Sequence, residues 1–284
     1  MQTVMNIIGQ GLALGAVNLL AALGLTIIYG VMGVVNLAHG ELIMLGSYAA
    51  ALFAVSLTFP GAVLVAFVGV AAIGVVLDAG LIRFLYHKPV ASMLGTWGLA
   101  LVIRQTVILA VGPELRYVAL PIAGSVSIGF GAQVAWWQVM LIACAAAVAG
   151  LVALVLMRTP FGLQMRAVVA NSDTAESLGI RTRSVNRWAF ALGAGLAGIA
   201  GAMIAPLRTV FPGMGLPYLV AAFLVVILAG LGNVRATVFW SVAVGIGTAA
   251  VAVPANDILA QIVVWSTALV IIAGRRKVVM VARV

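Results

Sequence analysis

Three side chains that can bind polar solutes or exchange protons lie close together early in the chain. Asn36, His39 and Glu41 belong to the stretch 36–41, and mostly apolar residues follow it. An ionisable group at membrane depth is costly, so it usually faces a cavity or a partner. Gly40 allows the backbone to break there, and broken helices expose backbone groups that bind solutes. We predict a solute path here, with Glu41 pointing into the protein; a tight turn at the membrane interface is the alternative.

A second polar group interrupts the apolar segment 93–111. Its members are Thr96, Trp97, Arg104 and Gln105. Arg104 follows the start of the segment by about 16 Å at 1.5 Å per residue, which is roughly half the membrane depth. An arginine at that depth either extends to the surface or pairs with a carboxylate. Glu41 and Glu114 are both candidate partners, and a structural ion pair is the alternative to contact with a solute.

The polar segment 158–187 carries the pattern of a short helix. Asp173 followed by Glu176 resembles a capping box, and Gly179 suits the position after a helix end, where a positive φ is needed. A helix over about 173–178 is too short to be stable alone in water. It therefore either docks onto a partner or is a connector held by the chain's own helices, and these residues do not choose between the two.

The sequence lacks the residues of a catalytic or metal site. Its single cysteine, Cys144, and two distant histidines do not make a zinc site. No G-x-x-x-x-G-K-[ST] run is present to bind phosphates. We predict no catalytic residue, metal or cofactor in this chain, so that any ATP-driven role needs a partner.

The composition of the chain is that of a membrane protein, so the elements that position these residues must lie in a membrane. Only 7% of the 284 residues are charged and 65% are apolar, whereas about 25% of the residues in a soluble domain are charged. A soluble enzyme, a nucleic-acid-binding protein and a disordered chain do not fit. The net charge of +9 is explained by basic residues in cytoplasmic loops.

Apolar segments of about 20 residues predict the membrane-spanning helices. There are nine candidates: 7–30, 37–57, 62–84, 93–111, 134–157, 188–206, 218–230, 237–253 and 258–273. The seventh and eighth are short and separated by glycines, so they form either a broken or re-entrant pair or two spans. We predict an all-α integral membrane protein, a polytopic bundle of about 8–9 transmembrane helices in a single domain over 1–284. Small residues at four-residue spacing, such as Gly11 and Gly15, predict close helix packing.

The distribution of Lys and Arg predicts the orientation. With the N-terminus outside and the C-terminus in the cytoplasm, 12 of the 15 basic residues lie in inner loops, as membrane proteins prefer. This orientation places 158–187 in the cytoplasm.

Four separated stretches resemble permease subunits of branched-chain amino acid ABC importers. They run from Gly30 to Tyr48, from Gly162 to Val185, from Gly193 to Gly201 and from Ala229 to Asn233. The stretches 94–101 and 177–183 are most similar to the urea and short-amide branch of that family. One departure is Arg235–Ala236, where the family usually has a glycine.

The resemblance implies import of a branched-chain amino acid, or of urea or a short amide, across the bacterial cytoplasmic (inner) membrane. It implies three kinds of protein partner besides the lipid bilayer: a second homologous permease, two cytoplasmic ATPases that bind ATP and Mg²⁺, and an extracytoplasmic solute-binding protein. It makes 158–187 the coupling loop. Ala175 is small and central in the short helix, so we expect it to lie where the backbones of this chain and of an ATPase come closest. The coupling residues would be Asp173, Thr174, Ala175, Glu176, Ser177 and Gly179. One alternative is a stand-alone secondary transporter or channel for a small neutral solute. Another is a membrane enzyme, which the missing catalytic cluster disfavours.

Overall fold

The computed structural model describes residues 1–86, 88–127, 133–230 and 232–281. Helices account for most of these residues, as apolar segments of this length require when backbone groups must be satisfied within a membrane. The helices are α1 (Gln2–Met32), α2 (His39–Gly80), α3 (Pro89–Val111), α4 (Trp136–Arg158), α5 (Pro160–Ala170), α6 (Ser172–Ser177), α7 (Thr182–Ile204), α8 (Leu216–Ala229), α9 (Val234–Ala252) and α10 (Asp257–Val281). Two short antiparallel strands, β1 (Ser125–Ser127) and β2 (Gln133–Ala135), pair with Val126 opposite Val134. The predicted all-α membrane class is confirmed.

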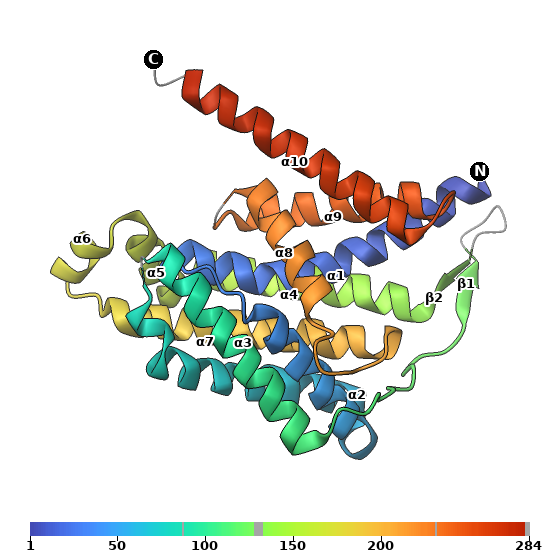
Figure 1. The fold of residues 1–284 in the computed structure, drawn as a ribbon, viewed down its shortest axis with the longest axis horizontal. Coiled ribbons are helices and arrows are strands. Elements are labelled where there is room, and N and C mark those ends of the chain that lie inside the picture. Colours follow the sequence, from blue (N-terminus) through green and yellow to red (C-terminus); the bar gives the residue numbers. More distant parts are fainter. Residues whose placement is uncertain (87, 128–132, 231, 282–284) are drawn as a thin grey trace.

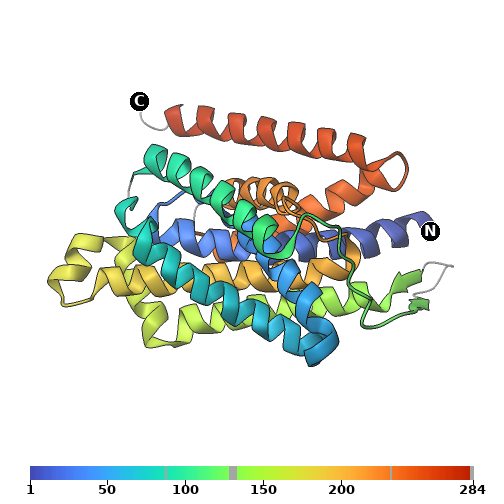
Figure 2. The ribbon, with the colours of Figure 1, turned by 60° about the horizontal axis from the view of Figure 1, so that its bottom comes forward.

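Within the described ranges, seven helices are long and apolar enough to cross a membrane. They are α1, α2, α3, α4, α7, α9 and α10, while α8 is a shorter apolar helix. The 42-residue α2 contains two of the nine predicted segments, joined across a kink at Thr58 (φ 59°, ψ 164°). Its two arms form a V (Figure 2). A β-branched residue at this φ is strained, and the bend separates two apolar arms that would be too long as one straight span.

The helices lie side by side, so the bundle has two ends (Figure 1). The N-terminus and the β1–β2 hairpin lie at one, which we call the N-terminal end. Helices α5 and α6 lie at the other, called the α6 end. Helix α10 runs along the outside, and its C-terminal part points toward the α6 end (Figures 1 and 2).

Helix α7 packs at the centre of the bundle through glycines. A methyl group on Gly193 would lie 2.7 Å from the carbonyl oxygen of Gly24 in α1. Gly198 faces both arms of α2: a methyl group on Gly46 would lie 2.1 Å from its carbonyl oxygen, and one on Gly198 would lie 2.5 Å from that of Ala66. These are backbone contacts that only glycine permits, which confirms the predicted packing role of the small residues.

The predicted glycine pair near the N-terminus packs α1 on α9. A methyl group on Gly11 would lie 2.7 Å from the Cα of Ile246, and one on Gly245 would lie 2.3 Å from the backbone nitrogen of Gly15. Further along the same helices, the hydroxyl groups of Thr26 and Thr237 are 3.0 Å apart and hydrogen-bonded. The two helices therefore contact each other along much of their length.

The segment 158–187 is more helical than predicted. Thr159 and Pro160 begin α5: the Thr159 hydroxyl accepts a hydrogen bond from the Gly162 backbone N–H at 3.1 Å, and proline suits the first helical position. Helix α7 begins at Thr182, earlier than the predicted 188. The expectation of a long loop with one short helix is wrong, because most of the polar residues of this segment lie on helices α5, α6 and α7.

Candidate functional site

Helix α1 ends at the α6 end of the bundle, and the chain then turns back into the interior. Residues 33–38 are not helical, and Gly33 adopts φ 63° after the last turn of α1. Helix α2 begins at His39, whose Nε2 donates to the carbonyl oxygen of Ala21 at 2.9 Å. Ala21 precedes the end of α1 by 11 residues, or about 16 Å. The stretch 36–41 therefore lies deep in the bundle, and a turn at the membrane interface does not describe it.

Side chains of α3 satisfy the backbone of the non-helical stretch. Thr96 Oγ1 accepts a hydrogen bond from the Leu37 backbone N–H at 3.0 Å, and Ser92 Oγ accepts one from the Val35 N–H at 3.2 Å. Irregular backbone at membrane depth requires such partners, since no bulk water is available there. Thr96 therefore positions the break in the chain through its hydrogen bonds to the backbone.

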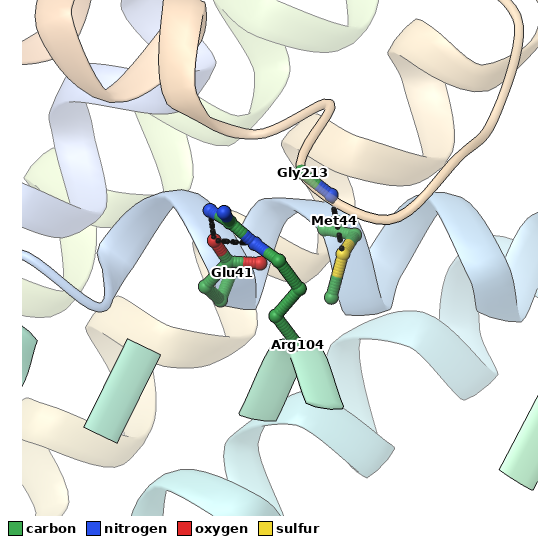
Figure 3. Close-up of polar contacts among 4 residues, drawn as sticks. All are labelled: Glu41, Met44, Arg104 and Gly213. Carbon is green, nitrogen blue, oxygen red and sulfur yellow. Dashed lines mark hydrogen bonds and ion pairs between the residues drawn. The ribbon is translucent and has the colours of Figure 1, made fainter. Parts of the chain in front are cut away.

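Glu41 and Arg104 form an ion pair across α2 and α3. Arg104 Nε donates to Glu41 Oε1 at 3.1 Å, and the Nη2 of the same guanidinium also reaches that oxygen (Figure 3). The Glu41 side chain is 4% exposed, whereas that of Arg104 is 34% exposed. The prediction that Glu41 points into the protein is confirmed, and of the two candidate partners it is Glu41, not Glu114, that pairs with Arg104.

The start of α8 meets the start of α2 beside this pair. A methyl group on Gly215 would lie 1.8 Å from the carbonyl oxygen of Gly40. The Gly213 backbone N–H contacts Met44 Sδ at 3.3 Å, next to Arg104 (Figure 3). Helix α8, with 14 residues, is only about 21 Å long. The predicted broken or re-entrant character of the seventh segment agrees with this short helix, which starts inside the bundle.

Three polar atoms of the stretch 36–41 are buried and lack a hydrogen-bond partner among the described residues. They are Asn36 Nδ2, His39 Nδ1 and Glu41 Oε2. Buried polar groups are normally hydrogen-bonded, so each unpaired one indicates a bound water or ligand or a functional role. The N-termini of α2 and α8 add partial positive charge at the same place. The stretch can thus present both donors and acceptors to a small polar molecule.

Two predicted path residues do not belong to this site. Trp97 is 54% exposed and Gln105 is also exposed, both on the outer face of α3. Each directly follows a residue that points inward, Thr96 or Arg104. Neighbouring residues in a helix are about 100° apart around the axis, so the inward position of one directs the next away from the site.

Helix α6 forms where predicted, but its cap differs. Asn171, not Asp173, is the N-cap: its side-chain oxygen accepts from the Thr174 backbone N–H at 2.8 Å. Asp173 lies in the first turn, where its charge favours the positive end of the helix. Gly179 adopts φ 84°, as predicted for the residue that follows a helix end. The Ile180 N–H then bonds to the Ala175 carbonyl at 3.0 Å, which completes a Schellman motif.

The residues that α6 offers to a partner differ from those expected. Ala175 is 2% exposed within this chain, so the expectation that it contacts a partner backbone is wrong. A small residue at the centre of α6 instead lets the helix lie close to its own chain. Leu178 is 77% exposed and was missed. An apolar residue directly before the stop glycine was the signal for it.

A second buried carboxylate, Asp78, was also missed. It lies near the end of α2, accepts a hydrogen bond from the Tyr86 hydroxyl, and lies 3.5 Å from Arg187 Nε of α7. Burial, and then the hydrogen bond to Asp78, raises the pKa of Tyr86 above its usual value. Tyr86 therefore stays protonated and remains a donor at neutral pH. A lone acid within the apolar segment 62–84 was the available signal.

A cavity of about 590 Å³ lies beside the N-terminal part of α8. Its walls come from α1, the segment 208–224, α9 and α10. Polar residues among the lining are Asn18, Arg208, Thr209, Tyr218, Thr248 and Gln261. Several of them are single polar residues within apolar segments, and this isolation was the signal available in the sequence.

Within the part of the chain that the structure describes, no three His, Cys, Asp or Glu side chains gather so as to hold a metal ion. Glu41 and Asp78 each pair with an arginine, so a guanidinium compensates the negative charge of each carboxylate.

Comparison with known proteins identifies the family. The family model for the permease component of branched-chain amino acid transport systems matches residues 7–273. The high-affinity branched-chain amino acid transport system permease protein LivH of Escherichia coli (strain K12) is 27% identical over 258 residues, or 84% of this chain and 83% of that protein. The corresponding protein BraD of Pseudomonas aeruginosa is 23% identical over 256 residues, with the same two coverages.

A third relative is the probable branched-chain amino acid transport permease protein LivH of Methanocaldococcus jannaschii. It is 25% identical over 244 residues, or 80% of this chain and 74% of that protein. No solved structure matches this chain significantly. The family comprises components of transport systems and is not a class of enzymes. Since the family model covers nearly the whole chain, the protein belongs to the permease components of branched-chain amino acid transport systems.

Proposed function

We propose that this chain is the permease subunit of an ATP-driven importer that carries a small polar solute, a branched-chain amino acid, into the cytoplasm. Three unpaired polar atoms of 36–41 carry this proposal, because they lie deep in the bundle where two helices begin. An α-amino acid needs both a carboxylate-binding and an ammonium-binding environment. The N-terminal ends of helices favour the first, and the carboxylate oxygen of Glu41 favours the second.

The partners in this proposal are a second homologous permease, two cytoplasmic ATPases and an extracytoplasmic solute-binding protein. Helix α6 supports the coupling part of the proposal. It is short, lies at the extreme end of the bundle (Figure 1), and presents the apolar side chain of Leu178. Contact with another protein would remove this apolar side chain from water, which is favourable.

The decisive experiment is reconstitution of the permease with its ATPases in liposomes. ATP hydrolysis is measured with the binding protein loaded in turn with leucine, isoleucine, valine, urea or acetamide. We expect stimulation by an aliphatic amino acid. Stimulation by urea or acetamide alone would assign the chain to the short-amide branch, and solute uptake by this chain without the ATPases would contradict the proposal.

Changing Leu178 to aspartate is expected to abolish most of the solute-stimulated ATP hydrolysis, because a charge replaces the apolar contact. Leu178 is exposed, so the variant should fold and insert normally. The matched control is Ile258→Asp, which changes an exposed residue of α10 at the opposite end of the bundle. Equal hydrolysis in Leu178→Asp and the unchanged complex would exclude α6 as the coupling element.

We further propose that the α6 end faces the cytoplasm. In a Cys144→Ala background, a cysteine at Ser177 in α6 should react with an impermeant thiol reagent only in inverted vesicles. A cysteine at Ser125 in β1 should react in intact cells, since β1 lies at the N-terminal end. Both positions are exposed. The reverse labelling pattern would contradict the orientation.

A further inference from the structure

A cavity of about 560 Å³ lies at the α6 end of the bundle, between α1, α4, α5 and the start of α9. Its walls are largely apolar and include Ile27 and Val31 of α1 and Ala153, Leu156 and Met157 of α4. The volume is within the roughly 300–1,000 Å³ of pockets that hold small molecules. No residue of the stretch 36–41 lines it, so this cavity is distinct from the proposed solute site.

Two arginines line the same cavity, Arg166 of α5 and Arg235 of α9. Both are exposed, and no acidic residue is among the lining residues. Neither arginine forms an ion pair with a carboxylate in the described ranges. The Arg166 guanidinium donates to the carbonyl oxygen of Leu156, which holds its charge at the edge of the apolar walls.

Arg235 does not stabilise the helix in which it lies. It is the second residue of α9, whose N-cap is Asn233. A cation at the positive end of a helix is unfavourable. An anion in the cavity would reverse this effect, since Arg166, Arg235 and the end of α9 would all attract it.

We propose that this cavity binds an anionic phospholipid from the membrane leaflet on the α6 side. The phosphate group lies between Arg166 and Arg235, and an acyl chain lies along the apolar walls formed by α1 and α4. Basic pockets between membrane helices bind anionic lipid headgroups in this way. A soluble anion would use the two arginines alone and would leave the apolar walls without a partner.

Native mass spectrometry of the purified full-length chain tests this proposal. The chain is mixed with equal amounts of phosphatidylglycerol and phosphatidylcholine, and the fraction carrying each lipid is measured. We expect a preference for phosphatidylglycerol that falls about tenfold or more in the double variant Arg166→Gln and Arg235→Gln. The double variant Arg181→Gln and Arg183→Gln removes the same charge at the same end but outside the cavity lining, and should keep the preference.

Two further measurements distinguish binding of a lipid from binding of a free phosphate. Ala153→Phe fills the apolar wall and keeps both arginines, so it should also lower phosphatidylglycerol binding. Glycerol phosphate, which has no acyl chain, should compete weakly. The proposal is overturned if the unchanged chain does not prefer phosphatidylglycerol, if the control variant loses the preference equally, or if glycerol phosphate competes fully and Ala153→Phe has no effect.

Discussion

Replacing Arg104 by leucine is expected to destabilise the protein by about 3 kcal/mol or more and to reduce transport at least about tenfold. The reason is the environment of Glu41, whose carboxylate is almost fully buried and receives two N–H donors from Arg104. Without the guanidinium this charge remains in the bundle uncompensated. The loss should be measured as thermal unfolding in detergent and as solute uptake in the reconstituted complex.

The opposite change, Glu41→Gln, should have a smaller effect on stability. Arg104 is one third exposed, so its charge remains partly solvated when the carboxylate is removed. Combining Glu41→Gln with Arg104→Leu should recover much of the stability lost in Arg104→Leu, which gives a measurable coupling between the two positions. The control is Gln105→Leu on the exposed face of α3, for which we expect no loss. An Arg104→Leu protein as stable as the unchanged one would show that the pair is not formed.

Changing Gly201 to alanine is expected to destabilise the protein by at least about 3 kcal/mol. The added methyl group would lie 1.8 Å from the carbonyl oxygen of Ile43, so α7 and α2 would have to move apart. The hydrogen bond that the Ser47 hydroxyl donates to the Gly201 carbonyl at 2.8 Å would be broken as well. The overlap involves backbone on both sides, and no side-chain rotation relieves it.

Gly150→Ala is the matched control for this change. Gly150 lies within α4, and a methyl group there would meet no atom within 4 Å. Alanine is favoured over glycine in a helix by about 1 kcal/mol, so this variant should be as stable as the unchanged protein or slightly more so. The two alanine variants are compared by the temperature at which the monodisperse fraction falls in size-exclusion chromatography. Equal midpoints would mean that α2 and α7 are less closely packed than the structure indicates.

The sequence predicts the spans and the break in the chain because those depend on local composition. Apolar runs of sufficient length must form helices in a membrane, and the ionisable residues near Gly40 mark where the helix is interrupted. The pairing of Glu41 with Arg104 depends on how α3 lies against α2, and two acids were equally suitable from the sequence. Which of Thr96 and Trp97 points inward depends on the rotation of α3 about its axis, and the sequence does not give this rotation.

The errors in the coupling segment have a local cause. Asn171 and Asp173 are both good N-cap residues, and only the backbone geometry shows that Asn171 is used. The burial of Ala175 depends on how α6 folds back on its own chain, which the spacing of polar residues does not reveal. Gly179 was predicted correctly because its role depends only on the helix end itself.

The central position of α7 also determines when helices α1 and α2 can complete their packing during synthesis. Helix α1 and both arms of α2 leave the ribosome about 100 residues before α7 begins, so their glycine faces enter the membrane without a partner. These faces can close only when α7 arrives, because Gly24, Gly46 and Ala66 all contact it. A nascent chain interrupted before residue 182 would therefore expose small-residue surfaces to other helices in the membrane. Such fragments should be substrates of membrane quality-control proteases.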